Sequence, residues 1–147
     1  MGNYLTSDNF RERLSEADLI QLTDDDGVGE LNDAVLAGVI ATAEADVDSY
    51  LSTRYLTPVD VSTSAGVAAM LKSRALDLAV YGLYLRRGNL PEQVATVRDN
   101  CIAWLRDVSA GRVALGLPMP AESSSSPTSG RVAYGGSDRK ANRLTGL

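Results

Sequence analysis

At 147 residues, of which 44% are apolar, the chain is long enough for one domain with a buried core and too short for two. It contains no histidine, so the commonest general acid–base group and the commonest metal ligand are missing, and most hydrolase and metalloenzyme classes are disfavoured. Residues 1–117 carry 17 acids and 10 bases, whereas residues 118–147 carry 2 acids and 4 bases, and an acidic body disfavours nucleic-acid binding.

The first residues show no basic stretch followed by an apolar run, so no secretory signal is expected. No apolar run approaches the roughly 20 residues that a membrane-crossing helix needs. We therefore expect a protein that is made in the cytoplasm and has no contact with membrane. The single cysteine, Cys101, lies among apolar residues at helical spacing and is predicted to be a buried core residue.

Two short helices are expected first. Thr6 or Ser7 can cap a segment that runs through Leu14, and Ser15 can start a second segment. The second segment ends at an acidic, glycine-containing turn, residues 24–29.

A long amphipathic helix is predicted from Leu31 to Tyr55, with Asn32 or Asp33 as its N-cap and Pro58 beyond its end. Its apolar residues recur at spacings of three and four, while polar residues take other faces. The apolar set is Leu36, Ile40, Ala43, Val47, Tyr50 and Leu51, and the polar set is Glu44, Asp46, Asp48 and Ser52.

The next predicted helix, from Val67 to about Arg87, is apolar around most of its circumference, so we expect it to be the central helix of the bundle. Arg74 and Asp77, three residues apart on its one polar strip, are predicted to pair with each other. Gly88 ends this helix. Pro91 in a first-turn position and Gly111 bound the last helix.

After Leu117 the composition changes to proline, serine and glycine, which cannot form a core of their own. The sequence therefore predicts an all-α protein, a small bundle of four to five helices over residues 1–117 with an extended C-terminal arm over residues 118–147.

The acidic turn partly matches a calcium loop, because Asp24, Asp26 and Gly29 occupy positions one, three and six of the EF-hand pattern. Val28 at position five and Val35 at position twelve supply no oxygen ligand. A small calcium-binding regulatory module is thus a weaker alternative. No other residues form a catalytic, metal or cofactor motif, so we expect neither an enzyme nor a bound cofactor.

A set of short segments recurs in a recognisable order and spacing along the whole chain. They are Tyr4, Leu5, Thr6 and Phe10; Leu19 to Asp24; Asp48 to Tyr55, with Pro58; Tyr81, Leu83, Tyr84, Arg86 and Arg87; Trp104 to Asp107; Ala110 to Val113; Leu115 to Leu117; Ser137 to Arg139; and Leu144 to Leu147. In these segments the chain resembles the Mu-like phage neck protein family of tailed phages and prophages. The final Leu147 departs from the pattern, since the family commonly closes on an aromatic residue.

The resemblance implies a structural head-to-tail adaptor, or connector, in the virion neck. Such proteins form a homo-oligomeric ring, commonly of about twelve copies, between the portal protein and a tail-terminator or stopper protein, and DNA passes through without specific binding. A tail-terminator or head-completion ring subunit is an alternative, although tail terminators usually mix helices and strands. DNA binding by the basic arm is a further alternative, with weak support from four scattered bases.

Two groups of candidate site residues follow. Acids near the first long helix are expected to line the DNA passage, because like charge prevents sticking; these are Asp24, Asp25, Asp26 and Glu30. Aromatic residues of the central helix and residues of the arm are expected at subunit interfaces; these are Tyr81, Tyr84, Tyr134, Arg139, Arg143, Leu144 and Leu147.

Overall fold

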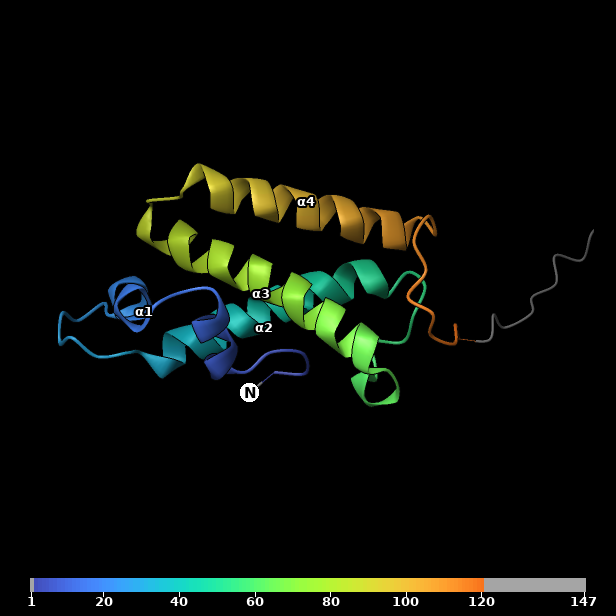
Figure 1. Ribbon diagram of the computed structural model, residues 1–147, viewed down its shortest axis with the longest axis horizontal. Helices are drawn as coiled ribbons and strands as arrows, with labels where there is room; N and C mark the ends of the chain where they lie inside the picture. Colours follow the sequence, from blue (N-terminus) through green and yellow to red (C-terminus); the bar gives the residue numbers. More distant parts are fainter. Residues whose placement is uncertain (1, 121–147) are drawn as a thin grey trace, which may run out of the picture.

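The computed structural model describes residues 2–120, and within that range all regular structure is helical (Figure 1). The prediction of an all-α bundle is therefore confirmed. Of the predicted arm, residues 118–120 fall within the described range. The elements in chain order are η1 (Ser7–Glu12), α1 (Glu16–Thr23), α2 (Asp33–Leu51), η2 (Val61–Thr63), α3 (Ala65–Arg87) and α4 (Glu92–Ser109), where η denotes a short 3-10 helix.

The helix ends follow the capping signals in the sequence. Ser15, Asn32 and Ser64 accept hydrogen bonds from backbone N–H groups in the first turns of α1, α2 and α3. These groups would otherwise lack a partner at a helix start. Gly88 follows α3 with a φ of +71°, a left-handed conformation that glycine adopts readily.

Some boundaries differ from the prediction. Helix α2 ends at Leu51 and not at Tyr55, because the α-helical bonding pattern breaks after Ser52: the Arg54 N–H donates to the Leu51 carbonyl three residues back, not to a carbonyl four residues back. Helix α3 begins at Ala65, two residues before Val67, since the Ser64 hydroxyl accepts the Val67 N–H. The first predicted short helix is a 3-10 helix.

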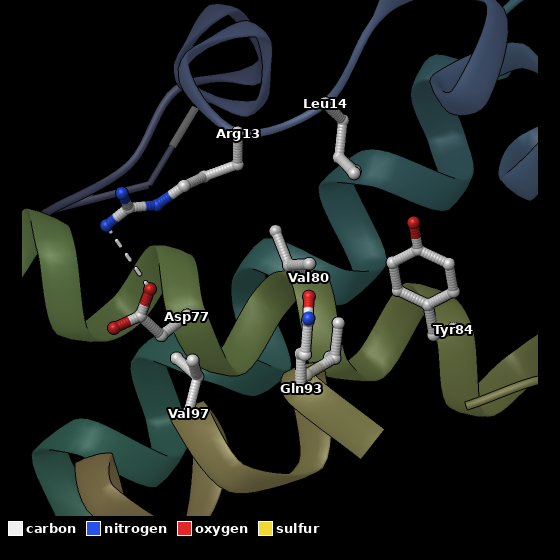
Figure 2. Close-up of a pocket in the computed structure, with 8 residues that line it drawn as sticks. Arg13, Leu14, Asp77, Val80, Tyr84, Gln93 and Val97 are labelled. Atoms are coloured by element: carbon white, nitrogen blue, oxygen red, sulfur yellow. Dashed lines mark ion pairs between the residues drawn. The ribbon is translucent and has the colours of Figure 1, made fainter. Parts of the chain in front are cut away.

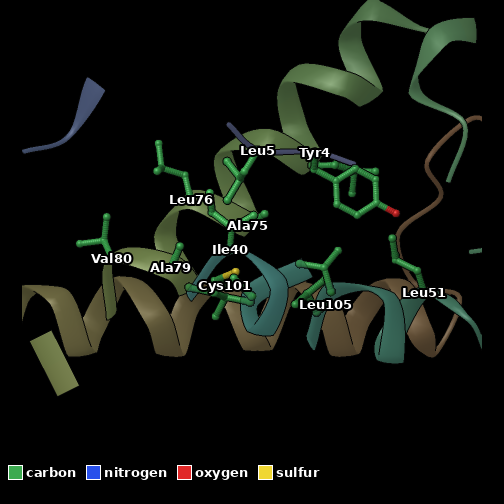
Figure 3. Close-up of a cluster of buried hydrophobic side chains, with 14 of the residues drawn as sticks. Tyr4, Leu5, Ile40, Leu51, Ala75, Leu76, Ala79, Val80, Cys101 and Leu105 are labelled. Atoms are coloured by element: carbon green, nitrogen blue, oxygen red, sulfur yellow. The ribbon is translucent and has the colours of Figure 1, made fainter. Parts of the chain in front are cut away.

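Helix α3 is central, as predicted. It lies between α2 and α4 in Figure 1 and also packs against η1, α1 and η2. Figure 3 shows Leu76 and Ala79 of α3 in one buried cluster with Ile40 of α2 and Leu105 of α4. Cys101 of α4 belongs to the same cluster, and burial raises the pKa of its thiol to about 11, so it is the inert core residue that the sequence predicts.

The prediction that Glu44 lies on a polar face of α2 is wrong. It is buried, with 6% of its surface exposed, and its carboxylate accepts backbone N–H groups from Asn3 at 2.8 Å, Tyr4 at 2.6 Å and Leu5 at 2.8 Å. A buried carboxylate is tolerated only when hydrogen bonds compensate for its lost hydration. Glu44 therefore fixes the N-terminal segment to α2.

Asp48, one turn further along α2, extends this arrangement. The Tyr4 hydroxyl donates to Asp48 at 2.5 Å and accepts the N–H of Val59 at 2.8 Å. Burial raises the pKa of Tyr4, and burial likewise raises the pKa of Asp48. Together with Gly2, which lies against the Glu44 carboxylate, we call these residues the N-terminal anchor: Gly2, Tyr4, Glu44, Asp48 and Val59.

Candidate subunit-contact surfaces

The acidic loop, residues 24–30, is organised by its first residue. The Asp24 carboxylate accepts the N–H of Gly29 at 2.7 Å and the N–H of Val28 at 3.0 Å. The bond from Gly29 contributes most to a lowered pKa of Asp24. Both of its oxygens are thus engaged in holding the loop.

Asp25 fastens the acidic loop to the end of α3. Its carboxylate lies 2.6 Å from Arg86 and 3.5 Å from Arg87, and both arginines also donate to the Leu22 carbonyl. The charge of Asp25 is therefore compensated. Asp26 and Glu30 are exposed and have no ion pair within residues 2–120, so they are the uncompensated acids among the four predicted to line a DNA passage.

The calcium alternative gains no support from this loop. The oxygens of Asp24 are occupied by backbone donors, and Asp25 is paired with arginines. Across the described range, no three acidic, cysteine or histidine side chains gather in a way that could hold a metal ion. A calcium loop needs about six oxygen ligands around one point.

Tyr84 lines a cleft of about 490 Å³ between α3, α4 and the connection from η1 to α1 (Figure 2). We call it the α3–α4 cleft. Leu14, Val80 and Val97 form its apolar walls, and Val97 is 43% exposed. The cleft therefore presents apolar surface beside a phenol, as subunit contacts often do.

Asp77, which also lines this cleft, does not form the predicted pair with Arg74. Its carboxylate lies 3.3 Å from Arg13, as the dashed line in Figure 2 shows, and forms no ion pair with Arg74. Arg74 instead stacks over the ring of Trp104 on α4, 5.1 Å from its centroid. Burial raises the pKa of Asp77, and Arg13 opposes that rise.

Tyr81 lies on a different surface. It lines a second hollow of about 490 Å³, the α2–α3 groove, whose walls are apolar. On the α4 side, the Arg98 guanidinium stacks over the Tyr81 ring at 5.2 Å from its centroid. Tyr81 and Tyr84, although three residues apart, thus serve two surfaces. The larger apolar residues of the groove are Val35 and Val39 from α2, with Leu78, Tyr81 and Leu85 from α3.

The predicted interface residues of the arm lie outside the described residues. They are Tyr134, Arg139, Arg143, Leu144 and Leu147. The point where the arm leaves the body is described. The N–H of Leu115 donates to the Tyr55 hydroxyl at 3.1 Å, beside the end of α2. Figure 1 shows this point at one end of the bundle and the acidic loop at the other.

No helix in the described range is both long and apolar enough to cross a membrane. The family model for "Bacteriophage Mu, Gp36" matches residues 4–134 of the chain, which is most of its length. The chain is also similar to "Gene product J" of Escherichia phage Mu, with 28% identity over 116 residues, covering 78% of this chain and 77% of that protein.

Proposed function

The chain belongs to the bacteriophage Mu Gp36 family, and on this premise we propose that it is a head-to-tail adaptor of a tailed phage. The resemblance to a Mu-like phage family is confirmed, and the chain is a phage protein. In the proposed role, about twelve copies form a ring in the virion neck between the portal protein and a tail-terminator or stopper protein, without enzymatic activity.

One observation carries the proposal: the acidic loop and the start of the arm lie at opposite ends of an elongated bundle (Figure 1). Helix α3 spans 23 residues between these ends. That corresponds to about 35 Å at 1.5 Å per residue. A subunit with this polarity can present Asp26 and Glu30 to DNA at one end and extend its arm toward another protein at the other.

The sides of the bundle supply contacts between copies. Neighbours in a ring meet through two different surfaces of the same chain, and the α2–α3 groove and the α3–α4 cleft both offer apolar surface. The helical structure of residues 2–120 also disfavours a tail-terminator role, because tail terminators usually mix helices and strands.

The proposal is tested with a phage that lacks the chain. We expect filled heads and complete tails that fail to join, and full-length protein supplied in trans should restore joining. A variant that ends at Pro120 should keep the helical circular dichroism of the body but fail to restore joining. Normal virions from that variant would remove the role of the arm, and normal virions without the chain would contradict the adaptor role itself.

A further inference from the structure

The α2–α3 groove is open to solvent although its walls are apolar. Leu78 forms part of its floor and is 6% exposed, whereas Leu85 at its edge is 54% exposed. A large apolar side chain that is half exposed beside an apolar hollow is typical of a surface that another chain covers.

The helices do not fill this groove. Gly38 of α2 and Gly82 of α3 line it from inside their helices, where glycine costs about 0.5–1 kcal/mol relative to alanine. A methyl group at Gly38 would meet nothing within 4 Å, and one at Gly82 would come no closer than 3.4 Å to Val39. Packing within the bundle therefore does not require glycine at position 38.

The unpaired charges at the groove are acidic. Asp46 lines the groove and Asp33 precedes the lining residue Ala34, and both acids are exposed and without an ion pair in the described range. The lining base Arg86 is paired with Asp25 at 2.6 Å, and Arg98, which stacks over Tyr81, is paired with Asp99 at 3.2 Å. An occupant that combines apolar side chains with positive charge would complement this surface.

The last 17 residues of the chain have that composition. Residues 131–147 contain four bases and one acid. The preceding ten residues, 121–130, can span about 33 Å when extended. That is about the length of α3, so a segment that leaves the body beside Thr63, where Pro118 and Pro120 lie, is long enough to reach an adjacent copy. The apolar residues of the segment are Val132, Ala133, Tyr134, Ala141, Leu144 and Leu147.

We propose that the α2–α3 groove of one copy binds residues 131–147 of a neighbouring copy, and this inference rests on the proposed ring. A ring contact joins two different surfaces of the same chain, and an apolar groove whose unpaired charges are acidic forms such a pair with a basic, partly apolar segment. The arm then links each subunit to the next.

The test uses disulfide trapping in phage particles that carry the full-length chain. Leu85→Cys is combined in turn with Tyr134→Cys, Leu144→Cys or Leu147→Cys, and the particles are oxidised and examined on a non-reducing gel. Cys101 is buried and stays unreactive. We expect at least one of the three pairs to give a ladder of dimers and higher multimers that reduction removes.

Val97→Cys is the matched control, because Val97 is 43% exposed and lies on the α3–α4 cleft. It should give no ladder with any of the three arm cysteines. An equal ladder from the control, a bond formed only within one chain, or no ladder at all would overturn the assignment. If the particles contain the chain at the neck but give no ladder, the groove assignment fails alone; if they lack the chain, the adaptor role fails as well.

Charge-reversal variants, tested in the same particles, show whether the yield of the ladder depends on electrostatics. Asp46→Lys should lower the yield of the ladder several-fold at low salt, because it places a base beside a basic segment. Glu92→Lys on α4, at an exposed residue that does not line the groove and has no ion pair in the described range, should leave the yield unchanged. Equal yields from the two variants would contradict the electrostatic part of the proposal.

Discussion

The two sides of α2 differ in whether their side chains find partners within the same chain. Its inner side holds the N-terminal anchor, where the Glu44 carboxylate and the Tyr4 hydroxyl each find partners within the chain. Its outer side borders the α2–α3 groove, where apolar walls remain open and Asp46 remains unpaired in the described range. The anchor therefore serves folding of one copy, whereas the groove leaves binding capacity that folding does not use.

The largest effect is expected from removing the buried carboxylate of the anchor. Glu44→Ala leaves three backbone N–H groups without their acceptor. We expect a loss of roughly 3–5 kcal/mol in the free energy of unfolding, measured by urea denaturation. Asp46→Ala, two residues away on the exposed side, should change it by no more than about 0.5 kcal/mol. Similar losses in the two variants would erase the contrast between the two sides.

Replacing glycine with alanine should lower the stability of the body at one position and raise it at another. A methyl group at Gly2 would clash with the buried Glu44 carboxylate, so Gly2→Ala should destabilise the body by about 1–3 kcal/mol. Gly38→Ala should stabilise it by about 0.5–1 kcal/mol, because nothing lies within 4 Å. Thermal melting of both variants shows whether each substitution raises or lowers the stability. Gly38→Ala should also lower the yield of the disulfide ladder, and destabilisation by this variant would show that the glycine serves the bundle.

The smallest effect is a pH dependence at Asp48. Because burial raises its pKa above the ordinary 3.8, the folded protein holds this proton more tightly than the unfolded chain does. The contribution of Asp48 to stability is therefore largest below about pH 4 and falls as the pH rises through the raised pKa. Asp48→Asn, which can still accept from Tyr4, removes this fall. Relative to the wild type, the variant should gain stability in urea denaturation as the pH rises from about 3.8 through the raised pKa, and a difference in stability that stays constant with pH would contradict the assignment.

Much of the fold could be predicted because it depends on local signals. The capping side chains Ser15 and Asn32 mark helix starts, Gly88 marks an end, and apolar residues around most of the circumference of residues 67–87 identify the central helix. Each signal acts within a few residues of the feature that it determines. Helix boundaries were less accurate where turns continue the backbone bonding, as at Arg54 and Tyr55.

The anchor could not be predicted in the same way, because its bonds join residues about 40 positions apart. One signal was nevertheless present. Glu44 follows Ile40 by four residues and precedes Val47 by three, so helical spacing places it on the buried stripe. Arg74 and Asp77 show the converse, since their spacing allows a pair, yet Trp104 and Arg13 from other elements engage them. In both examples, contacts between different elements determine which partners the charged side chains have.

Cryo-electron microscopy of the intact neck tests the adaptor role most directly. We expect a ring of this chain between portal and tail, with Asp26 and Glu30 facing the DNA channel and the arm extending away from it. A map in which the chain is absent from the neck, or in which the acidic loop points to the outside of the ring, would contradict it.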